Sequence, residues 1–578
     1  MIDSHGHKRS FSANKQSLRS SSSTAGLKQS PSITQGHGLR SLLAKRVAGL
    51  SPWSSLSSLR ASKVTATTTA GSRVPRLLEI DKKRISRFLS QNYLLIVILV
   101  SASIVLSLNI NKPFWGHHDW NGAWYSNFAR NFLRYGLIET KFGSVMNTGV
   151  VSPDGFHFFT HYPPLLPILL FLSFSTFGIH EWSARLVPLI FTLATIVAIY
   201  AIGNIFFNKR IAILAALFST VMPIVIYFGK MPVQETLVIA PVLLSVIAYF
   251  KFFEKPNRKN SLILVSALVF SHLINWPAYY VTPLFSAHWI LFSKNKSKKF
   301  TFLLFLAISL MMFGVHMLHT AWLTRDLIGG GLIDVLKFRL NIGEQLMGYS
   351  HTKFLELQAR WITVYFTRPI LFFSAIALIW IFINLIKRRF PKKTQILLML
   401  GIFGVTHNLV FRNMAFIHDY MIIYLWPFLA LSASFGFFIL VERLKIPRNV
   451  VPLLIVLVLT LCIQERFDFT KALILSNGFV EGVEVGKLVN SNTKEGEQTL
   501  ILSESFKENY EVFINYYSDR RIDYYLPSDE NLLQARLSQQ DYKLMVAMPQ
   551  RDTNEATLKF LQRSHKQTKI DNYLLFVK

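Results

Sequence analysis

The fold of this chain is decided by the stretch Asp81-Lys-Lys-Arg-Ile-Ser-Arg-Phe-Leu-Ser-Gln-Asn92-Tyr-Leu-Leu-Ile-Val-Ile-Leu-Val-Ser-Ala-Ser-Ile-Val-Leu-Ser-Leu-Asn109. A basic cluster precedes an apolar run that is long enough to cross a bilayer, which takes about 18 residues or more. Similar runs recur along the 578 residues, of which 51% are hydrophobic and only 16% charged. The sequence therefore predicts an all-α polytopic membrane protein. The single Cys462 excludes an intramolecular disulfide, so stability must come from helix packing.

The net charge of +30 is distributed as in a membrane protein. Residues 1–91 carry 16 Lys and Arg against 3 Asp and Glu, whereas residues 465–578 carry 15 against 17. The remaining positive charge falls mostly in short loops between apolar runs. This pattern follows the positive-inside rule and does not indicate a nucleic-acid-binding face. We therefore expect the N-terminus to be cytoplasmic and the loop after residue 109 to lie outside.

Three regions differ in composition. Residues 1–90 are basic and Ser-rich without sustained hydrophobic periodicity, which predicts a disordered cytoplasmic tail, although this composition also resembles an organelle transit peptide. Residues 91–464 form the predicted membrane domain, with outer loops at 110–182 and 323–366. Residues 465–578 alternate strand-like runs with polar helical stretches. They predict a small extracytoplasmic α/β domain with a partly parallel sheet, lying over the outer face.

The number of spans depends on the short apolar stretch 163–178. If this stretch crossed the membrane, almost all later basic loops would lie outside. We therefore interpret it as an interfacial or re-entrant segment before a span at about 183–206. About 11 transmembrane helices result.

The first outer loop contains Trp115-Gly-His-His-Asp119-Trp120-Asn-Gly-Ala-Trp124-Tyr125. Aromatic residues recur at every fourth position from Trp120 to Phe132, which predicts an amphipathic helix over 120–135 in the lipid headgroup layer. Asp119 stands at the N-terminal edge of this helix, where the helix dipole favours the ionised carboxylate. An ionised carboxylate there can act as a general base toward a substrate hydroxyl. A plain N-cap is the structural alternative, and both readings can hold together.

Further candidate residues fall on the same face, because they stand at the outer ends of predicted spans. They occur in Thr160-His161-Tyr162-Pro163-Pro164-Leu165, in Gly229-Lys230-Met-Pro-Val-Gln-Glu235 and in Arg412-Asn-Met-Ala-Phe-Ile-His418-Asp419-Tyr420. Ionisable groups at span ends are candidates for a shared cavity, and exposed polar loops are the alternative.

Metal binding is an open alternative at two of these places. His418 beside Asp419 can hydrogen-bond a substrate or ligate a metal with Glu235 or His161. His117-His118-Asp119 also looks like a metal cluster. Adjacent side chains on a helix edge diverge, however, so we expect Asp119 to act alone and assign no metal ligand.

The order of these motifs resembles that of the GT-C membrane glycosyltransferases, in the branch of protein O-mannosyltransferases and lipid A aminoarabinose transferases. An acidic residue follows the first span, and then come an outer interfacial helix, a Pro-Pro-Leu turn and Phe177-Gly-Ile-His-Glu-Trp-Ser-Ala-Arg185-Leu-Val-Pro188. The segment that ends at Glu235 looks like the second acidic site of that family. The resemblance covers residues 90–300 best, and it reaches the later spans only through their hydropathy.

The resemblance implies an integral membrane enzyme of a bacterial-type inner membrane or of eukaryotic endomembranes. Such an enzyme transfers a sugar with inversion from a polyprenyl-phosphate donor to a lipid, glycan or protein hydroxyl on the extracytoplasmic face, without a nucleic-acid partner. Asp119 would be the base, and Glu235 would orient substrate or share in catalysis. Lys230 or Arg412 would meet the lipid phosphate, because a departing phosphate needs cations. His161 stands where relatives often have Lys.

Two other classes of protein remain as alternatives. A secondary transporter would show paired halves with interrupted helices at the membrane midplane, and the sequence shows no internal repeat. A non-catalytic scaffold would leave Asp119 and Glu235 unconstrained. The outer segment 323–366, with Gly329-Gly-Gly331, Arg339, Glu344 and Gln345, is long enough to be functional, and we expect it to contact the acceptor.

Overall fold

The computed structural model describes residues 82–577, except for 294–299, 327–331, 343–346, 526–529, 549–552 and 554. It describes side chains from Asn92 onward. All of these residues belong to one unit, Ile80–Lys578. Most of the predicted N-terminal tail, the basic loop around Lys296 and the residues Gly329, Glu344 and Gln345 lie outside the described residues.

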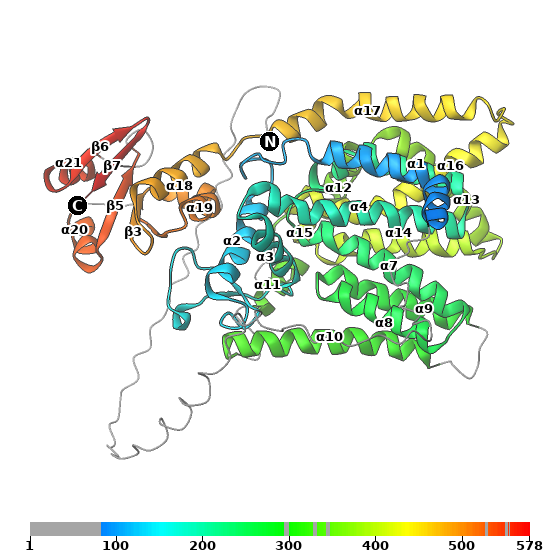
Figure 1. The fold of residues 1–578 in the computed structure, drawn as a ribbon, viewed down its shortest axis with the longest axis horizontal. Helices are drawn as coiled ribbons and strands as arrows, with labels where there is room; N and C mark the ends of the chain where they lie inside the picture. Colours follow the sequence, from blue (N-terminus) through cyan, green and yellow to red (C-terminus); the bar gives the residue numbers. More distant parts are fainter. Residues whose placement is uncertain are drawn as a thin grey trace, which may run out of the picture. The chain divides into compact units, whose positions relative to one another are not determined.

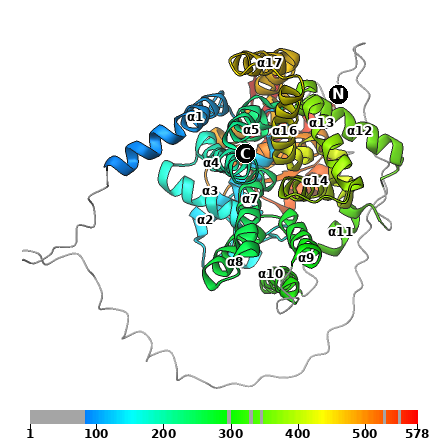
Figure 2. The same ribbon diagram turned by 90° about the vertical axis from the view of Figure 1, so that its right-hand side faces the viewer.

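Long apolar helices form a bundle in which they lie side by side (Figures 1 and 2). They are α1 (Lys82–Leu106), α4 (Glu181–Phe206), α5 (Lys209–Val221), α7 (Gln234–Glu254), α8 (Arg258–His272), α9 (Val281–Phe292), α10 (Thr301–Thr324), α13 (Arg368–Ile386), α14 (Lys392–Val410), α16 (Trp426–Arg443) and α17 (Val451–Leu475). Among the described residues, five helical segments are long and apolar enough to cross a membrane by length and composition: 181–206, 234–254, 301–324, 368–386 and 419–443. The chain is thus a helical protein with membrane-spanning segments, and the count of 11 spans stays a prediction.

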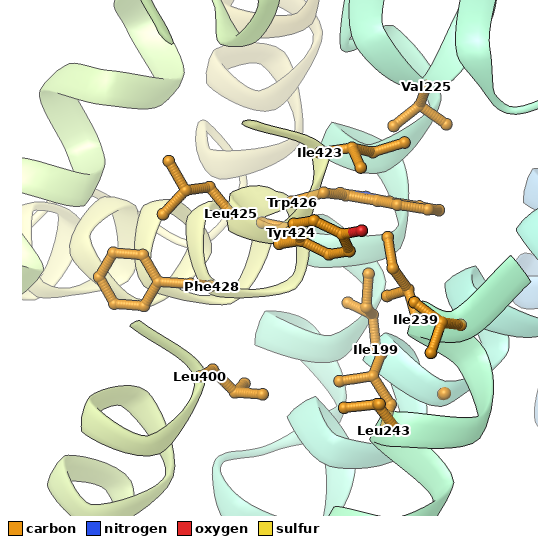
Figure 3. Close-up of a cluster of buried hydrophobic side chains, with 14 of the residues drawn as sticks. Ile199, Val225, Ile239, Leu243, Leu400, Ile423, Tyr424, Leu425, Trp426 and Phe428 are labelled. Atoms are coloured by element: carbon orange, nitrogen blue, oxygen red, sulfur yellow. The ribbon is translucent and has the colours of Figure 1, made fainter. Parts of the chain in front are cut away.

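Helix packing in the bundle is tight enough to select small residues. Gly436 of α16 faces the carbonyl oxygen of Phe373 on α13, and a Cβ at this glycine would lie 1.9 Å from that oxygen. A neighbouring core cluster brings together α4, α7, α14, α16 and the 3₁₀ segment η5 (Asp419–Leu425) around Trp426 (Figure 3). The indole of Trp426 donates a hydrogen bond to Ser219 Oγ of α5 at 2.9 Å, which satisfies its only polar atom inside the bundle.

Shorter elements cover one end of the bundle. They are α2 (Trp120–Tyr135), the antiparallel pair β1 (Ser144–Val145) and β2 (Phe158–Phe159), α3 (Leu165–Phe177), α6 (Pro223–Phe228), η2 (Trp276–Tyr280), α11 (Leu332–Leu340), α12 (His351–Phe366) and α15 (Arg412–Ile417), with the 3₁₀ turn η1 (Pro153–Gly155) between β1 and β2. The segment 323–366 is therefore largely helical. The stretch 163–178 forms α3, a helix of 13 residues that packs against α2 and α4.

The predicted amphipathic helix has the bounds of α2, but its surroundings differ from the expectation. Phe128 and Phe132 are buried within the protein, and the opposite side of α2 contacts the C-terminal region. Arg130 and Arg134 pair there with Asp519, with N–O distances of 3.3 and 2.5 Å. Protein covers much of this helix, because its polar stripe finds charged partners in the same chain.

The C-terminal region contains a five-stranded sheet in the order β4-β3-β5-β7-β6. Its elements are α18 (Val480–Asn492), β3 (Gln498–Leu502), α19 (Glu504–Ser518), β4 (Arg521–Tyr524), α20 (Glu530–Gln539), β5 (Tyr542–Ala547), α21 (Glu555–Ser564), β6 (Lys566–Ile570) and β7 (Tyr573–Val577). β3 is parallel to β4 and β5, whereas β7 is antiparallel to β5 and β6. Two separate apolar clusters use alternate residues of β3 and β5, so that each face of the sheet is covered.

Candidate active site

Asp119 lies buried at the start of α2, with 6% of its surface exposed. It occupies the N-cap position, but its carboxylate makes no capping hydrogen bond. Oδ2 instead accepts a hydrogen bond of 2.8 Å from the backbone N–H of Gly116. A Cβ at Gly116 would lie 2.8 Å from Oδ2 and 2.9 Å from the hydroxyl of Tyr227, so this tight turn needs glycine. The side chain of Asp119 therefore serves the loop and its surroundings and does not cap the helix.

Cationic side chains surround Asp119. Nη2 of Arg185, on α4, lies 3.4 Å from both carboxylate oxygens, while Nη1 donates to the carbonyl oxygens of Ile110, at 2.9 Å, and of Lys112. Lys112 and Lys230 line the same small pocket as Asp119. Burial, followed by the charge of Arg185, lowers the pKa of Lys230 to about 8. This arrangement places the carboxylate of Asp119 among three cationic side chains.

Lys230 is also committed to the backbone. Its Nζ donates to the carbonyl oxygen of Leu108, just after α1, and Nζ of Lys112 donates to Ile474 O, at 3.1 Å, and to Ser476 O near the end of α17. To bind a phosphate, as the sequence suggests, Lys230 would have to give up its hydrogen bond to the free carbonyl oxygen of Leu108 after the end of α1.

Glu235, in the first turn of α7, is the second buried acid, with 2% of its surface exposed. Oε1 lies 3.4 Å from the amide nitrogen of Asn275, and the buried Oε2 has no hydrogen-bond partner among the described residues. Tyr125, Tyr162 and Tyr420 lie within electrostatic reach of this carboxylate. A buried acceptor without a partner is costly, so Oε2 is suited to receive a hydroxyl from a bound substrate.

Tyr162 and His161 follow β2 directly. The ring of His161 packs on Phe159 with centroids 4.7 Å apart, and its carbonyl oxygen accepts a hydrogen bond of 2.9 Å from the indole of Trp276. Burial, with the charge of Arg339 as a smaller cause, lowers the pKa of His161 to about 4. The imidazole is therefore neutral at pH 7 and brings no charge to a phosphate.

Arg339, on α11, supplies the cation at this position. Its guanidinium stacks over the ring of Tyr162 at 4.6 Å, and only 6% of the residue is exposed. No described carboxylate forms an ion pair with it. Arg339 also lines a largely apolar cavity of about 510 Å³ between η2, α10 and α11. The sequence had placed Arg339 only in a general acceptor segment, because nothing near it in the chain indicates its contact with Tyr162.

The group His418, Asp419 and Tyr420 meets the first outer loop. Asp419 lies 2.8 Å from Nε2 of His117 and 3.1 Å from Nε2 of His118. The ring of His418 is stacked near that of Tyr420, with centroids 5.3 Å apart. Burial lowers the pKa of His418 to about 3. The expectation that the two neighbouring histidines diverge is wrong, because His118 has φ = 59° and both rings face Asp419.

Arg412 lies apart from these groups. Its guanidinium donates to Nδ1 of His351 at 2.5 Å and stacks over Phe354 at 4.9 Å, so both of these contacts are with α12. The structure thus brings together Asp119 with Lys230, Glu235 with Tyr162 and Tyr420, and Asp419 with the first loop. The ring of His118, which precedes Asp119, lies 5.0 Å from that of Tyr420 and connects these groups.

Comparisons with known proteins agree with this architecture. The model of the dolichyl-phosphate-mannose-protein mannosyltransferase family matches residues 161–319, whereas a comparison with curated proteins finds no match. The crystal structure of ArnT from Cupriavidus metallidurans bound to undecaprenyl phosphate is similar, with a TM-score of 0.56 and 12% identity over 84% of this chain and 98% of that one. Its apo structure gives a TM-score of 0.56 and 13% identity over the same shares of the two chains.

A second protein has the same type of fold. It is the archaeal oligosaccharyltransferase AglB from Archaeoglobus fulgidus, in complex with an inhibitory peptide and a dolichol-phosphate. The TM-score is 0.53 at 11% identity, over 85% of this chain and 74% of that one. The chain thus has a GT-C fold and is similar to protein mannosyltransferases and ArnT. These likenesses establish the fold, and the chemistry must be argued from the site.

Proposed function

We propose that this protein is a membrane glycosyltransferase that moves a sugar from a polyprenyl-phosphate donor to an acceptor hydroxyl on the extracytoplasmic face. The single observation that carries the proposal is Arg339, a buried guanidinium without a described carboxylate partner at the edge of an apolar cavity. Glu235 lies within electrostatic reach of Arg339 but forms no ion pair with it, and a buried charge without a partner in direct contact is unfavourable. A lipid phosphate provides both the missing counter-charge and the apolar chain that such a cavity can hold.

The donor would therefore lie with its phosphate at Arg339 and its prenyl chain in the cavity beside Trp276 and Phe313. Undecaprenyl phosphate in the ArnT structure and dolichol-phosphate in the AglB complex are ligands of this kind. Because Tyr162 lies under the guanidinium and near Glu235, a sugar attached to this phosphate would come close to the unpartnered Oε2 of Glu235. Arg339 takes the role that the sequence had suggested for Lys230 or Arg412.

The reaction would be a single displacement with inversion. The acceptor oxygen forms a bond to the anomeric carbon while the bond from that carbon to the phosphate oxygen breaks. The hydroxyl proton passes to a carboxylate, for which we propose Asp119, and the lipid phosphate leaves with the bonding electron pair against Arg339. Arg185 lies beside the carboxylate of Asp119 and orients it, and Glu235 holds a sugar hydroxyl through Oε2. The acceptor class, whether lipid, glycan or protein, is left to experiment.

The direct test is transfer from a panel of polyprenyl-phosphate sugars by the full-length protein in lipid nanodiscs. Arg339→Gln should lower kcat/KM by roughly 10- to 100-fold, because a charged hydrogen bond to the phosphate is lost. Asp119→Asn should lower kcat by about 100-fold or more if a general base is removed. Arg360→Gln is the matched control, since Arg360 is exposed on α12 in the same outer segment.

Three outcomes would contradict the proposal. Equal losses in Arg339→Gln and Arg360→Gln would remove Arg339 as the phosphate ligand. Full transfer by Asp119→Asn would remove Asp119 as the base. Uptake of a solute into vesicles without any sugar transfer would favour a transporter.

A further inference from the structure

The first outer loop and the start of η5 bring two imidazoles and one carboxylate into a compact cluster. One ligand atom from each of His117, His118 and Asp419 lies within 4.8 Å of the others. The two imidazole rings are 4.2 Å apart at their centroids and meet Asp419 from one side. Two imidazole nitrogens and a carboxylate oxygen form the ligand set of many sites for zinc and similar ions.

The backbone of the first loop is built to hold both rings in this position. His118 adopts φ = 59°, a backbone conformation that residues other than glycine rarely adopt. The carbonyl oxygen of His117 accepts a hydrogen bond of 2.7 Å from the hydroxyl of Tyr227, and the N–H of His117 donates to Ser476 Oγ at 2.9 Å. The loop is thus anchored on α6 and on the residue that follows α17. Such anchoring fixes a ligand pair before any ion binds.

The hydrogen bonding within the cluster is incomplete, which is the second observation. Oδ1 of Asp419 is buried near Nε2 of His118, yet it takes part in no hydrogen bond of good geometry with any residue that the structure describes. Nδ1 of the neighbouring His418 is also buried without such a partner. The other oxygen, Oδ2, accepts a hydrogen bond of 2.7 Å from the hydroxyl of Tyr365 and is hydrogen-bonded to Nε2 of His117 at 2.8 Å, a contact that a bound ion would replace. Tyr365 therefore orients the carboxylate, as outer-sphere donors do for metal ligands.

We propose that His117, His118 and Asp419 bind a divalent transition-metal ion of the zinc type on the outer face. Three protein ligands would leave one position of a tetrahedral ion for water or a substrate group. Asp119 is not part of this site, since its oxygens are engaged by Gly116 and Arg185. The proposal concerns binding of the ion, so it does not depend on which sugar or acceptor is used.

The experiment uses the full-length protein, purified without a histidine tag and stripped with a chelator. Zn²⁺ is titrated in competition with a coloured chelator, and the metal content is measured after desalting. We expect about one tightly held zinc ion per chain. Tyr365→Phe should weaken binding by roughly 10- to 100-fold, as expected for loss of an outer-sphere partner. His118→Ala and Asp419→Asn should weaken it further.

His157→Ala is the matched control, because His157 lies exposed in the same outer segment. It should bind zinc as the wild type does. Equal zinc content in wild type, His118→Ala and Asp419→Asn would overturn the proposal, and a cluster held together by hydrogen bonds alone would replace it.

A second measurement does not depend on the folding of any variant. Zinc should raise the melting temperature of the stripped wild-type protein by an amount that grows with the free ion concentration, because an ion that binds the native state stabilises it. The absence of any shift would also overturn the proposal. Both measurements are independent of sugar transfer, so a failed transfer assay leaves their meaning unchanged.

Discussion

The buried pair of Asp119 and Arg185 gives a prediction whose size follows from the structure. The two side chains are only 8% and 4% exposed, with 3.4 Å between Oδ1 and Nη2. Arg185→Met leaves a buried carboxylate without its nearest guanidinium and also frees the carbonyl oxygen of Ile110. Breaking such a buried pair costs about 3–5 kcal/mol. Adding Asp119→Asn should recover part of this loss, because a neutral amide needs no counter-charge.

The quantity to measure is the coupling free energy of this double-mutant cycle. Unfolding of the purified protein in mixed micelles, followed at increasing denaturing detergent, gives the four stabilities. We expect a coupling of about 1–3 kcal/mol, in the upper part of the range of about 0.5–3 kcal/mol found for residues in direct contact. The matched control cycle uses Lys353 and Glu356, whose charged atoms also lie 3.4 Å apart but whose side chains are 61% and 70% exposed. Such an exposed pair should couple by no more than about 0.5 kcal/mol.

The result that refutes this reasoning is a cycle for Asp119 and Arg185 that is as additive as the control cycle. Arg185 would then stabilise the fold only through its bonds to carbonyl groups. Arg185 would then not hold the carboxylate of Asp119 in place for its proposed role as base.

Three further predictions concern other parts of the chain. Gly436→Ala should destabilise the protein by about 1–3 kcal/mol or more in the same unfolding assay, because its Cβ would meet the carbonyl oxygen of Phe373 and force α13 and α16 apart. The pKa of Lys230 is about 8 in the folded state, below its usual value of 10.5. At a pH between these two values, Lys230 is protonated in the unfolded chain but has lost its proton in the folded chain. The free energy of unfolding of the wild type, relative to that of Lys230→Met, should therefore rise between about pH 8 and 10, by up to about 1.4 kcal/mol per pH unit. A difference between the two proteins that does not change with pH would contradict this prediction. Asp519→Asn removes the charge that Arg134 contacts at 2.5 Å. Limited proteolysis should then cut the chain faster just after residue 475. An unchanged cleavage rate would show that this ion pair does not hold the C-terminal region against α2.

Much of the fold could be predicted from local patterns in the sequence. The four-residue aromatic spacing predicts the bounds of α2, and the predicted outer loop 323–366 ends just before α13 begins at Arg368. These patterns work because helix periodicity and span length are properties of short segments. The edge strand β6 (Lys566–Ile570) was missed, since its residues are mostly exposed and polar and carry no alternation of apolar side chains.

The candidate site was predictable only in part, because its contacts join distant segments. Arg339 and Tyr162 are far apart in sequence, and only the packing of α11 beside the turn after β2 reveals their pairing. The positions of His117 and His118 depend on the positive φ angle of His118, which the sequence pattern does not predict. Asp119 and Glu235 could be proposed from the sequence because both stand at the start of a predicted helix, a position that local sequence patterns identify.

The C-terminal region makes direct contacts with the loop that carries Asp119. The hydroxyl of Tyr517, at the end of α19, accepts the N–H of Phe114 at 2.7 Å and donates to Glu181 at 2.7 Å. One side chain of this domain thus ties the loop that carries Asp119 to the start of α4, the helix that carries Arg185. Ser476, which directly follows α17, also accepts the N–H of His117, so two side chains after residue 475 anchor the loop. A loop with this many anchors should lose little conformational entropy when a donor or an ion binds, so we expect the contacts of Tyr517 and Ser476 to favour binding at the proposed sites.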